Sequence, residues 1–318
     1  RLNIDIYEGD CIEQLKRLAD QSINTCITSP PYWGLRNYQE DKQLGMEDTP
    51  EEFISNLVDV FREVKRVLRD DGTVWLNLGD TYCGTGHKGN YTDPKHKEGR
   101  NGQKIALNNK IDGLKSKDLV GIPWRVALAL QQDGWYLRQD IIWHKPNTMP
   151  ESVKDRCTKA HEYIFLLSKN KKYYYDYEAI KEDAKRPNER QIFGGSKAKN
   201  NTIKKDDPMS RGGSEQWGRE IITSPKRNKR SVWTVPTKPF KGAHFATFPP
   251  ELIEPCILAG CPEGGVVLDP FGGSGTTAVV ANAHNRNTIL IELNKEYIEI
   301  AKKRLSHNED MFTQIEVM

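Results

Sequence analysis

The tetrapeptide Ser29-Pro30-Pro31-Tyr32 combines residue types that can hold a flat ring bearing an amino group. Two consecutive prolines stiffen the backbone, so the Ser29 hydroxyl and the Pro30 carbonyl can point at one spot as paired hydrogen-bond acceptors. Tyr32 adds an aromatic face beside them. The two acceptors would take the two hydrogens of an exocyclic amino group while the ring stacks on the tyrosine.

Such an amino nitrogen is a poor nucleophile because its lone pair is delocalised into the ring. Hydrogen bonds to both of its hydrogens favour a pyramidal nitrogen whose lone pair is free to attack a methyl sulfonium. No strong base is needed before the attack, since the proton can leave afterwards to solvent or to a nearby acceptor. Taken alone, a Pro-Pro pair also suits a stiffened turn in a loop.

A second candidate site is the glycine-rich segment 269–277, Asp-Pro-Phe-Gly-Gly-Ser-Gly-Thr-Thr. Glycines between a strand and a helix let the backbone approach a ligand and adopt dihedral angles that other residues avoid. Gly273-x-Gly275-x-x-Ala278 satisfies the dinucleotide-binding pattern, and Glu292 follows at the roughly 20-residue offset of a ribose-binding acid. No lysine follows the glycines, which excludes a phosphate-binding P-loop. The segment therefore favours a ribose-containing ligand, with a nicotinamide cofactor as one alternative.

Alternating strands and helices must position these two segments. Residues 50–69 predict the clearest helix, with Thr49 as the N-cap and Glu52 completing a capping box. Asp71-Gly72 is expected to end that helix. Strands are expected at 3–7, 23–28, 73–78, 141–143, 163–167, 266–268 and 289–291, and further helices at 12–18, 122–130, 275–284 and 296–305. This alternation predicts a mostly parallel sheet covered by helices on both faces.

Charge is distributed unevenly along the 318 residues, whose net charge is +3. Residues 169–241 hold 19 Lys and Arg against 9 Asp and Glu, so the remainder of the chain carries a net charge of −7. A basic segment on an acidic body is typical of a polyanion-binding region, although a solvated insert has the same composition. Residues 84–117, rich in Gly, Asn and Lys, are expected to form a mobile loop.

The six cysteines are scattered, without a framework spacing or a Cys-x-x-Cys pair; they are Cys11, Cys26, Cys83, Cys157, Cys256 and Cys261. The scatter argues against a zinc site, and no metal is expected. It favours reduced thiols in an intracellular, cytoplasmic protein. No apolar run approaches the length of a membrane span.

Together the two segments resemble the amino-methylating DNA methyltransferases, which use S-adenosylmethionine as the methyl donor. That family pairs a catalytic motif, Asp, Asn or Ser followed by Pro-Pro-Tyr, with a Phe-x-Gly-x-Gly cofactor loop, and residues 28–33 and 269–277 match both. The catalytic motif precedes the cofactor loop, which is similar to the family's β-class order. The resemblance covers most of the chain, because further family segments are similar to residues 7–10, 140–147, 161–163 and 244–249.

The resemblance implies roles for individual residues. Glu292 would take the ribose hydroxyls of the cofactor, Asp10 the adenine edge, and Asp269 would brace the loop. Phe248 belongs to the segment that would close over the methionine part. The cofactor would be lined by Phe271, Gly272, Ser274, Gly275 and Thr276. The catalytic site that holds the target base would be Ser29, Pro30, Pro31 and Tyr32.

The resemblance also implies a fold and a partner. The fold is a Rossmann-like α/β methyltransferase with a mostly parallel seven-stranded sheet, helices on both faces, and one antiparallel strand in a hairpin within about residues 135–170. Residues 1–168 and 242–318 would form the catalytic and cofactor-binding halves of one domain, and residues 169–241 a target-recognition insert. The partner is double-stranded DNA, whose target base must be flipped out at a cost of a few kcal/mol. A companion restriction endonuclease is compatible with this assignment, as are a monomer and a dimer.

Several substrates are distinguished by the motifs. Serine in the first motif position is more typical of cytosine-N4 enzymes and aspartate of adenine-N6 enzymes, so cytosine N4 is favoured and adenine N6 is the alternative. Cytosine-C5 methylation needs a Pro-Cys nucleophile, but the neighbours of Pro255-Cys256 predict a packed helix. Protein-glutamine methyltransferases place the glycine loop before a related motif. A nicotinamide-dependent oxidoreductase would leave the basic insert unexplained, and an inactive DNA-binding module would not need two intact motifs.

Overall fold

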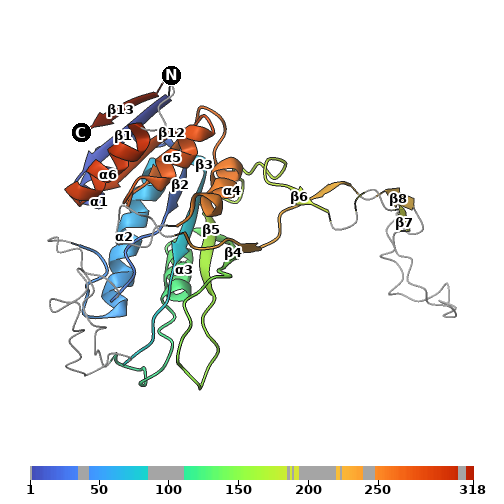
Figure 1. Cartoon of the computed structure of the whole chain (residues 1–318). Helices are drawn as coiled ribbons and strands as arrows, with labels where there is room; N and C mark the ends of the chain where they lie inside the picture. The colour runs from blue at the N-terminus through green and yellow to red at the C-terminus, as the bar shows by residue number, and fades with distance from the viewer. Residues whose placement is uncertain are drawn as a thin grey trace, which may run out of the picture. The chain divides into compact units, whose positions relative to one another are not determined.

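A computed structural model gives the fold and describes residues 2–34, 43–84, 111–184, 187, 190–192, 220–222, 224–238, 248–306 and 313–318. The chain divides into a main unit, Arg1–Asp176 with Arg230–Met318, and a second unit, Tyr177–Lys229 (Figure 1). Most of the loop expected at 84–117 lies outside the described residues, as do residues 244–247 of the segment that contains Phe248.

One nine-stranded sheet forms the centre of the main unit, counted over the described residues. In spatial order its strands are β10 (Val232–Thr234), β4 (Tyr136–His144), β5 (His161–Ser168), β3 (Leu68–Leu78), β2 (Ile23–Thr28), β11 (Val266–Asp269), β12 (Asn287–Glu292), β1 (Leu2–Glu8) and β13 (Thr313–Val317). Neighbouring strands are parallel, except that β5 is antiparallel to both β3 and β4.

The Rossmann-like sheet with one antiparallel strand is confirmed, and that strand lies in the β4–β5 hairpin within the expected range. The expected count of seven strands is wrong, because β10 and β13 extend the sheet at its two edges. Both are short, with three residues in β10 and five in β13. Strands of so few residues show little hydrophobic alternation, and the sequence pattern therefore does not reveal them.

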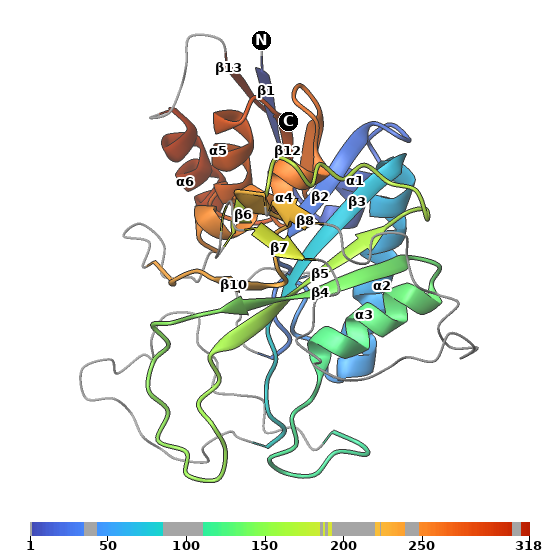
Figure 2. The ribbon, with the colours of Figure 1, turned by 90° about the vertical axis from the view of Figure 1, so that its right-hand side faces the viewer.

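Helices cover both faces of the sheet (Figure 2). The helices on one face are α1 (Cys11–Leu15), α2 (Pro50–Val67) and α3 (Ile122–Gln132), and those on the other are α4 (Pro250–Gly260), α5 (Thr276–Ala283) and α6 (Lys295–Ser306). No helix within the described ranges is both long and apolar enough to cross a membrane.

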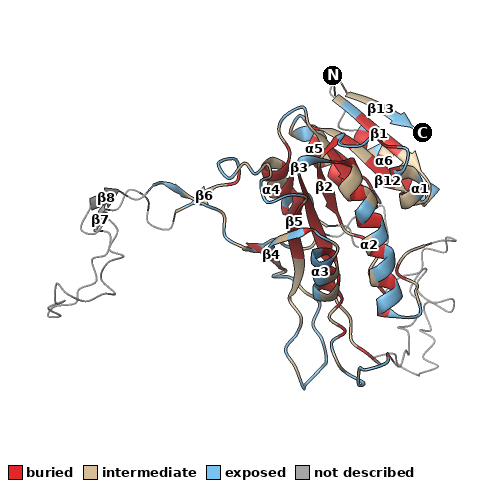
Figure 3. Cartoon of the chain, turned by 180° about the vertical axis from the view of Figure 1, so that it is seen from behind, coloured by how far each residue is buried: buried red, intermediate tan, exposed pale blue. Residues whose placement is uncertain are grey.

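Helix α2 shows how local sequence and packing agree. The Thr49 hydroxyl accepts a hydrogen bond from the Glu52 backbone N–H at 3.2 Å, and Pro50 occupies the first turn, where no N–H is needed. One face of the helix is buried against the sheet (Figure 3). Each large apolar side chain buried there stabilises the fold by about 1.5–3 kcal/mol. The buried residues are Phe53, Leu57, Val60, Phe61, Val64 and Val67.

The expected end of this helix at Asp71-Gly72 is wrong. Helix α2 stops at Val67, and β3 begins at Leu68, which pairs with Ile23 of β2. The backbone that follows finds its hydrogen-bond partners about a hundred residues further along the chain, in the segment 169–174. Local sequence carries no signal for partners that distant, so the Asp-Gly pair resembled an ordinary helix stop.

The second unit contains two short antiparallel ribbons. Strand β6 (Glu182–Asp183) pairs with β9 (Lys226–Arg227), and β7 (Arg190–Ile192) pairs with β8 (Glu220–Ile222). An ion pair of 3.0 Å between Arg227 and Glu182 crosses the first ribbon. Both strand pairs lie inside the basic segment 169–241.

Candidate active site

Four adjacent parallel strands bring the sequence-predicted residues to one edge of the sheet. Strands β2, β11, β12 and β1 are neighbours in that order, so their carboxyl ends lie together. Ser29 follows β2, Asp269 and Glu292 end β11 and β12, and Asp10 lies two residues beyond β1. In open parallel sheets, ligands bind outside this edge.

Asp269 ties the two sequence motifs together. Its Oδ1 accepts hydrogen bonds from the Thr28 hydroxyl at 2.7 Å and from the Phe271 N–H at 3.1 Å, and its Oδ2 accepts from the Thr277 hydroxyl at 2.6 Å. Thr28 immediately precedes the tetrapeptide, whereas Thr277 lies in the first turn of α5 (Thr276–Ala283). Burial raises the pKa of the Asp269 carboxyl to about 6, although its three donors act in the opposite direction.

The glycines of the 269–277 loop are required by packing and by backbone geometry. A Cβ on Gly272 would lie 3.0 Å from the Cβ of Leu290. Gly275 has a φ of +77°, and a Cβ there would lie 2.9 Å from the Cβ of Ala301. The loop is thus pressed against β12 and α6, which leaves its opposite side for a ligand.

Arg304, in α6, holds the same loop in place through hydrogen bonds. Its Nη1 donates hydrogen bonds to the Ser274 carbonyl at 2.7 Å, to the Ser274 hydroxyl at 2.7 Å and to the Thr276 hydroxyl at 3.0 Å. Ser274 and Thr276 are both buried. The hydroxyls of these two residues, which were both expected to line the cofactor, therefore face the arginine.

Glu292 and Asp10 are held by backbone N–H groups. The Glu292 carboxylate accepts from Gly273 at 2.7 Å and from Asn294 at 2.9 Å, and burial raises its pKa. The Gly9 N–H donates to the Glu292 carbonyl at 2.9 Å, which joins the ends of β1 and β12. Asp10 caps α1 by accepting from the Glu13 N–H at 3.0 Å.

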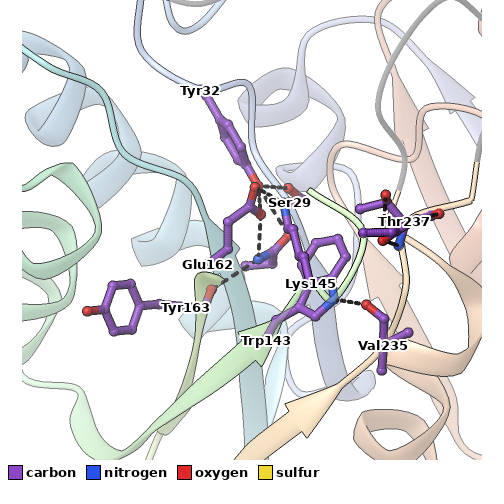
Figure 4. Close-up of polar contacts among 10 residues, drawn as sticks. Ser29, Tyr32, Trp143, Lys145, Glu162, Tyr163, Val235 and Thr237 are labelled. Carbon is purple, nitrogen blue, oxygen red and sulfur yellow. Dashed lines mark hydrogen bonds and ion pairs between the residues drawn. The ribbon is translucent and has the colours of Figure 1, made fainter. Parts of the chain in front are cut away.

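Tyr32 of the tetrapeptide is anchored at both ends of its side chain, and Figure 4 shows the contacts of its hydroxyl group. Its ring lies against Gly79, where an added Cβ would be 2.5 Å from the ring's Cε2. Its hydroxyl donates to Glu162 Oε2 at 2.8 Å, with Asn77 Oδ1 at 3.2 Å as a second acceptor. The Ser29 hydroxyl donates to the Tyr32 oxygen at 3.4 Å.

Glu162 is in turn held by the β4–β5 hairpin. Its Oε1 accepts from the Lys145 ammonium group, which also lies 4.1 Å from the ring centroid of Trp143. The Trp143 indole N–H donates to the Val235 carbonyl at 2.8 Å (Figure 4). A chain of contacts thus runs from the edge strand β10 to the tetrapeptide.

Sequence reasoning missed three of these residues: Glu162, Lys145 and Arg304. Glu162 had a signal, because one strand of the hairpin expected within about residues 135–170 had to be antiparallel, and the first residues of such a strand lie at the carboxyl edge of the parallel strands. Arg304 had none, since a basic residue in the last turn of a helix needs no other explanation. Of the predicted cofactor residues, Phe248 lies half-buried just before α4, with no described hydrogen bond to the loop.

Cys256 can be set aside as a nucleophile. It is 1% exposed within α4, where its thiol faces the Leu252 carbonyl at 3.8 Å. Among the described residues, no group of three or more His, Cys, Asp or Glu side chains is arranged to hold a metal ion.

Comparisons with known proteins agree on one family. A family model for N6/N4 DNA methylases matches residues 23–303. The chain is 49% identical over 300 residues to the Type II methyltransferase M.Cfr9I of Citrobacter freundii, covering 94% of this chain and 87% of that protein. It is 47% identical over 301 residues to M.SmaI of Serratia marcescens, covering 94% and 90%.

Solved structures share the fold. The PvuII DNA methyltransferase, specific for cytosine N4, superimposes with a TM-score of 0.63 at 19% identity, covering 98% of this chain and 88% of that one. A putative DNA modification methylase of Thermus thermophilus, complexed with S-adenosyl-L-methionine, gives a TM-score of 0.58 at 23% identity and covers 99% of both chains.

Proposed function

Because this chain belongs to the N6/N4 DNA methylases and is a Type II, S-adenosylmethionine-dependent DNA methyltransferase, we propose that it methylates the N4 amino group of cytosine. The proposal of cytosine rests on Ser29, because serine in the first position of the motif is more typical of cytosine-N4 enzymes. The N6 amino group of adenine is the alternative target, and the same residues would hold it.

The residues at the sheet edge suit the methyl donor. A carboxylate has about four lone-pair sites that can accept hydrogen bonds. Two of those of Glu292 accept from the backbone N–H groups of Gly273 and Asn294, so the others can accept from two ribose hydroxyls. Asp10 lies beside it for the adenine edge, and the loop 271–276 offers backbone rather than hydroxyl groups because of Arg304. When bound, the donor supplies an electrophilic methyl group on a sulfonium. Phe248 is proposed to close over its methionine part.

The tetrapeptide would then prepare the nucleophile. The Ser29 hydroxyl and the Pro30 carbonyl accept the two amino hydrogens, Pro31 stiffens their spacing, and the base stacks on Tyr32. The nitrogen lone pair forms a bond to the methyl carbon as the carbon–sulfur bond breaks. The methylated nitrogen afterwards gives up one proton to solvent, which restores the neutral base.

DNA binding is proposed for the basic insert 169–241, whose clustered lysines and arginines suit phosphate contacts. The second unit, Tyr177–Lys229, forms most of this insert. A base inside a duplex cannot reach the methyl donor, so the target base must be flipped out of the stack. We also propose that the methylated sequence is the one cut by a companion restriction endonuclease.

Digesting treated DNA to nucleosides for mass spectrometry tests the base assignment. N4-methylcytosine is expected. N6-methyladenine would overturn the assignment to cytosine and leave the family membership intact, whereas unmodified DNA would overturn methylation of double-stranded DNA itself.

Two substitutions test the role of the tetrapeptide. Ser29→Ala and Tyr32→Ala should slow methyl transfer at least ~10-fold, because each removes a contact to the target base, while the dissociation constant for S-adenosylmethionine stays within about 2-fold. Ser22→Ala, at the opposite end of β2, is the matched control and should change neither quantity. Equal losses of transfer and cofactor binding at Ser29 would refute the role given to this motif.

A further inference from the structure

Glu162 is an ionisable group beside the reaction site for which the proposed mechanism has no role. Its side chain is 16% exposed, and it lies at the start of β5, the one antiparallel strand of the described sheet. Both carboxylate oxygens are engaged: Oε2 accepts from the Tyr32 hydroxyl at 2.8 Å and from the Asn77 amide at 3.4 Å, and Oε1 accepts from Lys145. Burying a carboxylate is unfavourable unless such partners are present.

Lys145 and its surroundings keep this carboxylate in one place. The ammonium group is as little exposed as its partner, at 16%, and it also lies over the Trp143 ring. Trp143 is paired with Glu162 in the register of the β4–β5 hairpin. The carboxylate is therefore fixed by two strands and an ion pair before any ligand binds.

The contact with Glu162 fixes the orientation of the Tyr32 side chain. A tyrosine ring on a turn can adopt several rotamers, and only one of them would lie parallel to a base held by Ser29. Gly79 lets the ring lie against the backbone, and Glu162 holds the hydroxyl at the far end. A hydrogen bond to a charged acceptor is stronger than one between neutral groups, so this contact favours one rotamer.

The same contact sets the direction of hydrogen bonding towards Ser29. Because Tyr32 donates its only hydroxyl hydrogen to Glu162, its oxygen is left to accept from the Ser29 hydroxyl (Figure 4). Ser29 then gives its own hydrogen to Tyr32 and presents lone pairs to the site. Lone pairs are what an incoming amino group requires.

We propose that Glu162 is a positioning residue for methyl transfer, which acts through the Tyr32 hydroxyl and is held by Lys145. It aligns the aromatic face and makes Ser29 an acceptor. The proposal rests on the proposed role of the tetrapeptide, but not on whether the target is cytosine or adenine.

A double-mutant cycle between Glu162→Gln and Tyr32→Phe tests it, with kcat and both KM values measured on DNA that contains the recognition sequence. Glutamine keeps the size of the side chain but can donate to Tyr32, and phenylalanine keeps the ring but loses the hydroxyl. Each single variant should lower kcat ~10-fold and leave the KM for S-adenosylmethionine within about 2-fold. The double variant should be no slower than Tyr32→Phe, because both changes break one contact.

Independent effects that multiply to ~100-fold in the double variant would overturn the proposal, as would an unchanged kcat in Glu162→Gln. Glu151→Gln is the matched control, since Glu151 also forms an ion pair in the β4–β5 connection but does not contact Tyr32. If Glu162→Gln melts below the assay temperature, a cycle of Lys145→Gln with Tyr32→Phe replaces it and is judged by the same two outcomes. A product of N6-methyladenine would refute the choice of base and leave this cycle valid.

Discussion

Replacing Asp269 by asparagine should change how the stability of the fold depends on pH. The carboxyl is buried, and its pKa is raised from 3.8 to about 6 in the folded protein. A folded state that holds its proton more tightly than the unfolded chain gains stability in acid. This contribution is fully present below the unfolded pKa and is lost as the pH rises through about 6.

The size of the effect follows from the raised pKa. A rise from 3.8 to about 6 corresponds to about 3 kcal/mol. Because part of the transition lies below the usable range, about 2 kcal/mol should be lost between about pH 4.5 and pH 7.5. Asparagine does not titrate. With its amide oxygen at the position of Oδ1 it still accepts from Thr28 and Phe271, and the Thr277 hydroxyl can turn to accept from its amide nitrogen.

The assay is urea denaturation of both proteins across that range, without the methyl donor. The unfolding free energy of the wild type minus that of Asp269→Asn should fall by about 2 kcal/mol from the acid to the neutral end. Asp112→Asn, at an exposed position, is the matched control. Parallel curves for the wild type and Asp269→Asn would refute the assignment of a raised pKa to this carboxyl.

Three further substitutions have expected outcomes. Arg304→Met removes the hydrogen-bond donor to the glycine loop. The dissociation constant for S-adenosylmethionine, measured by calorimetry, should rise ~10-fold, with kcat at saturation little changed. An unaltered dissociation constant would contradict the role of Arg304 in holding this loop. Gly275→Val places a side chain at a φ of +77° and against Ala301, so urea melts should show a loss of about 2 kcal/mol or more. Cys256→Ser should keep methyl transfer, because the thiol is buried within α4, and an inactive but folded variant would revive a thiol mechanism.

Many of the strands and helices could be predicted from the sequence, because the pattern that indicates each of them lies within one short stretch of the chain. The Thr49 cap of α2 is one example, and the two motifs that follow β2 and β11 are others. Each depends on residues within a turn or two of one another. Strands β2 and β11 are parallel neighbours, so the motifs that follow them share one edge of the sheet.

Features made by distant partners were not predictable in the same way. Strand β3 begins early because the segment 169–174 supplies its hydrogen bonds, and β10 and β13 exist only as additions to an edge. The contacts of Glu162 and Arg304 depend on strand register and helix packing. Strand register and helix packing do not produce a periodic pattern in the sequence. The two motifs at the site were therefore easier to recognise than Glu162 and Arg304, which support them.

The placement of β11 and β12 between β2 and β1 has a consequence for the newly made chain. Strands β1 and β2 leave the ribosome before β11 and β12, yet they do not pair with each other, since these two later strands separate them. The centre of the sheet thus closes only when residues 266–292 arrive, and contacts of such long range make folding slow. Until then the glycine-rich loop 269–277 has not been made, and the early strands lack their neighbours in the sheet. Translation must therefore have passed residue 292 before this edge of the sheet can form.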